Sequence, residues 1–157
     1  MTIAAGKKPS AADLVLPAVV TGYGNGSNTI TATSWTVLPT NTCTAAITNP
    51  HPTAAMRILC TYGGWLSASA NDVRMMPAVS GSVTIAAGVG TSAAGWGEVP
   101  MADSAAGYAQ IQGSFTYDLP VSGTAATFSM QAYRSSGSGT QVVAYPVIRL
   151  IPICYVF

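Results

Sequence analysis

Hydrophobic and polar residues alternate along most of this chain, in short runs that Gly and Pro residues interrupt. The clearest run, residues 56–67, places Met56, Ile58 and Cys60 at every second position. A period of two is typical of a β-strand with one buried face. Further predicted strands cover residues 29–38, 43–48, 72–79, 82–86, 96–101, 108–119, 127–134 and 142–156.

These strands predict an all-β protein. About nine short strands with turn signals between them are typical of an antiparallel β-sandwich, and we favour a jelly roll. No internal repeat is visible, which argues against a propeller or a solenoid. We expect the sandwich to span residues 23–157, and residues 1–22 to form a short N-terminal arm before a Gly- and Asn-rich hinge.

The last predicted strand is hydrophobic on both faces. In an antiparallel protein such a strand needs a second cover, either a partner subunit or a second sheet with a covering loop. Pro146 and Pro152 also predict a bulge or a sheet edge there. We expect this strand to form the interface of a homotrimer. The residues expected at that trimer interface are Tyr145, Ile151, Ile153, Tyr155 and Phe157.

The chain carries few charges: 6 Lys and Arg and 5 Asp and Glu among 157 residues, with a net charge of +1. About a quarter of the residues are charged in an ordinary domain. So small a net charge gives no field to hold nucleic acid. It also provides little repulsion between copies, so we expect other subunits to cover much of the surface. The single His and the scattered carboxylates favour a protein that is not an enzyme and uses no cofactor.

Two groups of residues suggest chemistry nevertheless. Glu98 and Asp103 are candidates for the carboxylate pair of a glycoside hydrolase, although ordinary turn chemistry explains them better. His51, between Pro50 and Pro52, could bind a metal on a threefold axis, or it could lie in a rigid turn, which we favour.

The three cysteines, Cys43, Cys60 and Cys154, fit no zinc-binding pattern. Because each lies in a hydrophobic or Thr-rich run, we expect buried free thiols. One disulfide with one free thiol is the alternative.

Trp65 and Trp96 lie beside glycines. If they are buried, they close the ends of the sandwich, and this is the arrangement we favour. If they are exposed, they and Tyr108 offer rings on which sugars could stack.

No hydrophobic run approaches the roughly 20 residues of a transmembrane helix, and the N-terminal residues do not fit a secretory signal. The sequence therefore predicts no membrane partner. The residues expected to attach the arm to another protein are Lys7, Lys8, Leu14, Leu16 and Val19.

Several segments resemble a known viral module. They are residues 96–99 (Trp-Gly-Glu-Val), 113–120 (Gly-Ser-Phe-Thr-Tyr-Asp-Leu-Pro), 127–134 (Thr-Phe-Ser-Met-Gln-Ala-Tyr-Arg) and 145–152 (Tyr-Pro-Val-Ile-Arg-Leu-Ile-Pro). Together they resemble the small jelly-roll modules, of the trimeric tumour-necrosis-factor type, on virion proteins of tailed phages, especially phages of actinobacteria. Residues 5–14 likewise resemble the start of many phage fibre proteins.

The resemblance implies a non-enzymatic structural protein on the virion surface, assembled in the cytoplasm of the bacterial host. Its expected partners are two further copies of itself and a major capsid or tail protein that the arm contacts. Tail proteins with this module often carry long additional regions, so the short chain favours a capsid decoration or head-fibre protein. The alternative is a minor tail or tail-fibre protein that recognises a host cell-wall glycan through Trp65, Trp96 or Tyr108.

Overall fold

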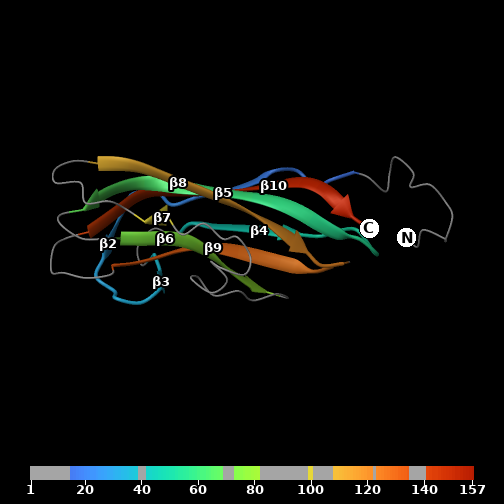
Figure 1. Ribbon diagram of the computed structural model, residues 1–157, viewed down its shortest axis with the longest axis horizontal. Coiled ribbons are helices and arrows are strands. Elements are labelled where there is room, and N and C mark those ends of the chain that lie inside the picture. Colours follow the sequence, from blue (N-terminus) through green and yellow to red (C-terminus); the bar gives the residue numbers. More distant parts are fainter. Residues whose placement is uncertain are drawn as a thin grey trace.

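The computed structural model describes residues 15–38, 42–68, 73–81, 99–100, 108–121, 123–134 and 141–157. Within these ranges the chain forms strands and the segments that join them, and no helix (Figure 1). The described residues accordingly include no helix long and apolar enough to cross a membrane.

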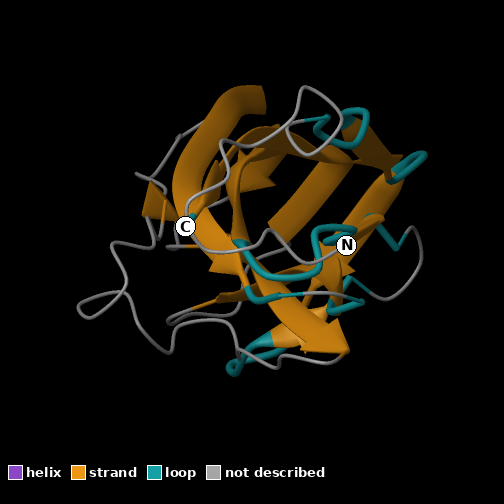
Figure 2. Cartoon of the chain, turned by 90° about the vertical axis from the view of Figure 1, so that its right-hand side faces the viewer, coloured by secondary structure: helices purple, strands orange, loops and turns teal. Residues whose placement is uncertain are grey.

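The strands form two antiparallel sheets. Sheet A contains β1 (Val20–Tyr23), β2 (Ser27–Ile30), β5 (Ala55–Ala68), β8 (Tyr108–Leu119) and β10 (Gln141–Val156). Sheet B contains β3 (Thr36–Val37), β4 (Thr44–Thr48), β6 (Val73–Gly81), β7 (Val99–Pro100) and β9 (Ala125–Arg134). The two sheets pack face to face, as Figure 1 shows from the side and Figure 2 from the end where the C-terminus lies. The predicted β-sandwich is confirmed.

The strand pairing is nested. β1 and β2 pair with β10, β3 and β4 pair with β9, β5 pairs with β8, and β6 pairs with β7. Nested pairing of this kind arises when one long antiparallel hairpin folds over on itself, which gives a jelly roll. The pairing of β5 with β8 is unbroken from Met56 opposite Leu119 to Ser67 opposite Tyr108.

Two predicted boundaries differ from the structure. Residues 29–38 were expected as one strand, but β2 belongs to sheet A and β3 to sheet B, so the chain crosses between sheets at residues 31–35. Val20–Tyr23 pair with β10, so the sandwich includes the last residues of the expected 1–22 arm. The predicted strand at 82–86 lies outside the described residues.

The core lies between the sheets and consists of the inward-facing positions of the alternating strands. Its largest fully buried hydrophobic side chains are Phe128, Leu38, Met56, Ile58, Leu66, Met75, Met76, Leu119, Met130, Ile148 and Leu150. Phe128 of β9 lies 6.3 Å from Phe115 and 6.2 Å from Tyr117 of β8, measured between ring centroids. Burial of each such side chain contributes about 2 kcal/mol, which holds the two sheets together.

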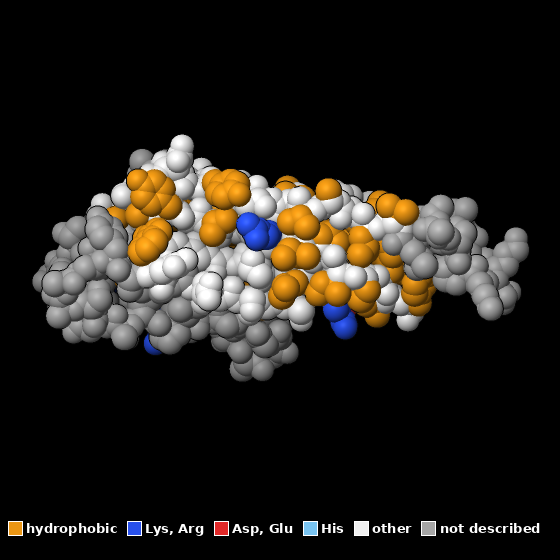
Figure 3. All heavy atoms as spheres, turned by 90° about the horizontal axis from the view of Figure 1, so that it is seen from above, with side chains coloured by type: hydrophobic (Ala, Val, Ile, Leu, Met, Phe, Trp, Pro, Cys, Tyr) orange, Lys and Arg blue, Asp and Glu red, His pale blue; other side chains and the backbone are white. Residues whose placement is uncertain are grey.

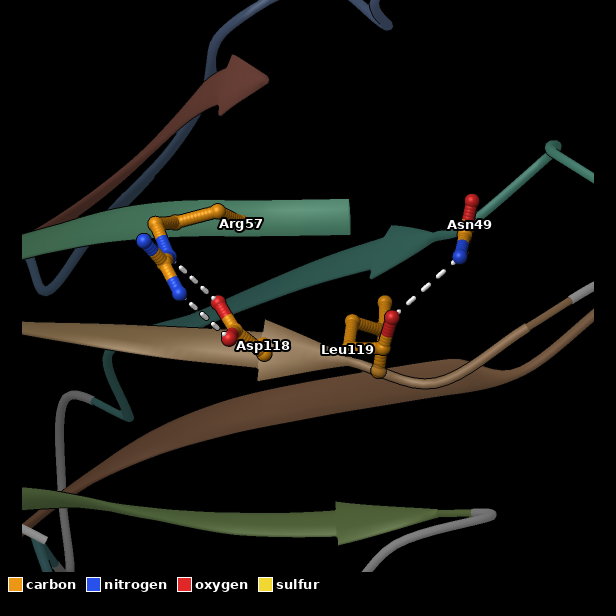
Figure 4. Close-up of polar contacts among 4 residues, drawn as sticks. All are labelled: Asn49, Arg57, Asp118 and Leu119. Carbon is orange, nitrogen blue, oxygen red and sulfur yellow. Dashed lines mark hydrogen bonds and ion pairs between the residues drawn. The ribbon is translucent and has the colours of Figure 1, made fainter. Parts of the chain in front are cut away.

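The buried side chain of Asn49 closes one end of the sandwich. Its amide nitrogen donates to the carbonyl oxygens of Ala54 at 2.9 Å, Leu119 at 3.2 Å and Pro120 at 2.7 Å. Its side-chain oxygen accepts the backbone N–H of His51 at 2.9 Å. Figure 4 shows Asn49, which follows β4, directed at Leu119 at the end of β8. Buried backbone carbonyls need such donors, and here one side chain supplies them.

Candidate functional site

The outer face of sheet A carries a groove whose centre is a glycine. Residues that lie opposite one another on β10, β5 and β8 form rows across the sheet. One row contains Arg149, Thr61 and Ser114, and the next outward-facing row contains Val147, Gly63 and Gln112. Side chains of these residues point away from the core, because their neighbours along each strand, such as Tyr62 and Ile148, are buried. Gly63 has no side chain, so the middle of this face is hollow.

The hollow forms an open groove of about 760 Å³. Its polar lining includes Thr61, Gln110, Gln112 and Ser114, and its two ends differ in chemistry. A volume of several hundred Å³ with a few placed polar groups is typical of a small-molecule site.

Two aromatic side chains stand at one end of the groove. Trp65 is 44% exposed and Tyr145 is 60% exposed. Both line the groove, and both also line a second depression of about 320 Å³ beside Ser27. Trp65 was expected to be buried at an end of the sandwich. That expectation is wrong, because Trp65 lies two residues after Gly63 and shares its outward side of β5.

A bulge in β10 directs Tyr145 outward. The register shifts between Ala144 and Val147, so β10 contains one more residue there than β5. Tyr145 has a φ of 50°, a left-handed backbone angle that costs a residue other than Gly about 1–3 kcal/mol. Its N–H donates to the carbonyl oxygen of Gly26 at 2.8 Å, which holds the bulge against the segment between β1 and β2.

Arg149 provides the charge at the opposite end of the groove. Its side chain is exposed, and it lies in the middle of β10. Among the described residues, Asp118 is the only side-chain carboxylate, and it pairs with Arg57 at 2.7 Å. Within that part of the chain Arg149 therefore has no carboxylate to neutralise it.

A second feature of the outer face of sheet A is hydrophobic. The name apolar surface is used here for Leu59, Ile151, Ile153 and Val156, which lie beyond Arg149 toward the end of β10. Leu59 pairs with Ile151 across β5 and β10, and Ile153 and Val156 are 45% and 36% exposed. Figure 3 looks onto this face and shows hydrophobic side chains gathered along it with a cation among them.

The structure separates the residues expected at the trimer interface. Ile151 and Ile153 belong to the apolar surface, Phe157 lies beside His51, and Tyr145 stands at the far end of the groove. Tyr155 is half-buried. Its hydroxyl donates to the carbonyl oxygen of Val15 at 2.9 Å, and its ring lies 4.6 Å from that of His51.

His51 is buried and orders the turn that contains it. Its Nδ1 accepts the backbone N–H groups of Thr53 at 3.2 Å and Ala54 at 2.9 Å. Its ring also lies edge-on to Phe157, at 5.4 Å between centroids. Nowhere in the described ranges do three His, Cys, Asp or Glu side chains come together in a way that could hold a metal ion.

The three cysteines are free thiols in different environments. Cys43 and Cys60 are buried, and burial raises the pKa of Cys43 to about 11 and raises that of Cys60 as well. Cys154 is exposed, so the expectation that it is buried is wrong. A register shift between Pro152 and Cys154 adds one residue to β10 and moves Cys154 to the outer side, opposite Arg57.

Several candidates lie outside the described residues: Lys7, Lys8, Leu14, Trp96, Glu98 and Asp103. Of Tyr108 only the backbone is described, at the start of β8. Leu16 of the expected arm packs against the core, and Val19 is 53% exposed just before β1.

Sequence reasoning missed the residues that complete the groove. Gln110, Gln112 and Arg149 each occupy an outward position of a strand that the alternation predicts. The alternation shows which side of its own strand a residue occupies, and it does not show which residues of other strands lie beside it. No family model matches the chain, and no curated protein matches it.

Proposed function

We propose that this chain is a non-enzymatic structural protein of a tailed-phage virion, and that it assembles as a homotrimer through the apolar surface. The observation that carries this proposal is the exposure of Ile153 and Val156 beside Leu59 and Ile151 on one sheet face. Exposed hydrophobic side chains in a contiguous group are typical of protein interfaces.

The charge of the molecule supports assembly about an axis. Equal charges meet at a symmetry axis and repel, so a face poor in charge is suited to it. On the outer face of sheet A, Arg57 and Asp118 pair with each other, so Arg149, at the border of the apolar surface, is the one described charge there without a paired carboxylate. Burial of the apolar surface supplies about 25 cal/mol for each Å² removed from water.

The placement on a virion is supported by the resemblance to phage surface modules of the segments at residues 96–99, 113–120, 127–134 and 145–152. The jelly roll is the fold that this resemblance implies. In this proposal a capsid decoration or head fibre attaches to the major capsid protein through the N-terminal arm, and a tail location is the alternative.

The assembly is tested by light scattering coupled to size-exclusion chromatography. We expect the wild-type protein to have three times the chain mass of 15.9 kDa. Ile153→Asp places a charge in the apolar surface and should give single chains or insoluble protein. Ala46→Asp adds the same charge at an exposed position of β4 in sheet B, and should keep the wild-type mass. A monomeric wild type, or a soluble Ile153→Asp trimer, contradicts the proposal.

The location is tested by electron cryomicroscopy of the particle that contains the chain. Threefold clusters of density over the capsid support a decoration protein. Density confined to the tail contradicts that role and supports receptor binding.

A further inference from the structure

The groove on sheet A has a polar lining, unlike the neighbouring apolar surface. This difference suggests that the groove binds a ligand and is not part of the subunit interface. The groove is lined along β8 by the polar side chains of Gln110 and Gln112, with Thr61 and Ser114 beside them. A polar, hollow lining of this kind differs from the close-packed and largely apolar core of a protein interface. A copy of the chain packed flat across it would leave the hollow over Gly63 unfilled.

The two exposed aromatic side chains are suited to sugar rings. The face of an aromatic ring carries negative potential, and the C–H bonds on one face of a pyranose present weakly positive hydrogens to it. Trp65 and Tyr145 stand side by side at the end of the groove, where the strained backbone of Tyr145 holds its ring outward. From this end to the row of Arg149 the distance along β5 is about 13 Å, the length of a short oligosaccharide.

The polar lining is suited to the substituents of such a chain. The side-chain amides of Gln110 and Gln112 can each donate and accept hydrogen bonds, as can the hydroxyls of Thr61 and Ser114. Sugar hydroxyl groups also donate and accept hydrogen bonds. Side-chain amides therefore suit them better than groups that can only accept.

The charge of Arg149 selects among sugars. A guanidinium binds a carboxylate through two parallel hydrogen bonds. No side-chain carboxylate among the described residues pairs with the guanidinium of Arg149. We infer that the groove binds an acidic oligosaccharide, with sugar rings against Trp65 and Tyr145 and a uronate carboxylate on Arg149. This assignment does not depend on the trimer, because the groove is formed within one chain.

The test is a titration with three uronate oligosaccharides: trigalacturonic acid, a hyaluronan hexasaccharide and a mannuronate trimer. The readout is the indole N–H signal of Trp65 in proton–nitrogen correlation spectra, where the other two Trp residues serve as internal references. We expect at least one uronate to shift the Trp65 signal alone. Isothermal titration calorimetry, which does not need the Trp65 signal, measures the binding of the variants. Trp65→Ala should abolish binding, and Gly63→Thr, which fills the hollow with a residue that strands favour, should abolish it as well.

The charge is tested with a matched pair of variants. Arg149→Gln should weaken binding of the uronate about tenfold or more, since a charged hydrogen bond is lost. Arg57→Gln removes an exposed cation of the same face outside the groove and should leave binding unchanged. The methyl ester of the trigalacturonate should not distinguish wild type from Arg149→Gln.

Three results overturn the inference: no uronate shifts Trp65, the Arg149→Gln and Arg57→Gln variants bind alike, or Trp65→Ala changes the assembled mass instead of the binding. Circular dichroism melting confirms that each variant is folded. A monomeric protein that binds the uronate contradicts the proposed trimer and supports the groove, so the two proposals fail separately.

Discussion

The side-chain amide of Asn49 donates to the backbone carbonyl of Leu119, which lies 70 residues later in the chain. This contact joins the end of β4 in sheet B to the end of β8 in sheet A (Figure 4). The two sheets are thus tied by a polar contact at one end, and by hydrophobic packing elsewhere.

Replacement of Asn49 by Asp tests this contact without a change of shape. The variant keeps the oxygen that accepts the N–H of His51 but places a carboxylate oxygen against three carbonyl oxygens. We expect the free energy of unfolding in urea to fall by about 3 kcal/mol, the cost of leaving buried polar groups unpaired. Thr48→Asp adds the same charge one residue earlier at an exposed position and should cost far less. Equal losses in the two variants, compared at the same protein concentration, would show that the amide has no special role.

At Gly22 the edges of the two sheets lie close together. A Cβ atom at this position would overlap the backbone carbonyl of Thr44 in β4, and the carbonyl oxygen of Gly22 accepts the thiol of Cys43 at 3.3 Å. Gly22→Ala should therefore lower the free energy of unfolding by about 2 kcal/mol or more, because the backbone must move. Thr21→Ala, at the neighbouring position of β1, should have a small effect. Urea unfolding of both variants checks this, and a Gly22→Ala protein as stable as wild type rules out the close approach.

The thiols of Cys43 and Cys60 should be protected in the folded protein. Burial raises the pKa of both, so they remain neutral thiols at ordinary pH, and the thiolate is the reactive form. In a Cys154→Ser variant, a thiol reagent at about pH 8 should react with neither cysteine until denaturant is added. Fast modification of either thiol in the native variant would refute their burial.

The ion pair between Arg57 and Asp118 should make a small, pH-dependent contribution to stability. The hydrogen bonds from Arg57 lower the pKa of Asp118, so the folded state favours the carboxylate (Figure 4). The contribution is complete above the ordinary aspartate pKa of about 4, and it is lost as the pH falls through the lowered pKa.

Melting temperatures of wild type and Asp118→Asn should accordingly differ slightly near neutral pH and converge in strong acid. Added salt should narrow the difference at neutral pH, because both side chains are exposed and screened by solvent. A difference that grows as the pH falls would contradict this account.

The strands that form the groove could be predicted from the sequence because alternation is a local property. Residues 56–67, 108–119 and 127–134 alternate over most of their length, and they correspond closely to β5, β8 and β9. The inward-facing residues of a strand can be identified from the pattern within that strand alone. The hydrophobic character of residues 142–156 on both faces likewise indicated that the outer side of β10 is unusual.

By itself the sequence determined the class of fold, the strands and the low charge of the surface. Tertiary structure alone decided which outward residues meet: Gly63 beside Val147 and Gln112, and Trp65 beside the bulge that exposes Tyr145. It also decided that Cys154 is exposed, because one extra residue in β10 moves each later side chain to the opposite side of the strand. The physical reason is that alternation repeats every two residues within a strand, whereas register and bulges depend on pairing between segments far apart in the chain.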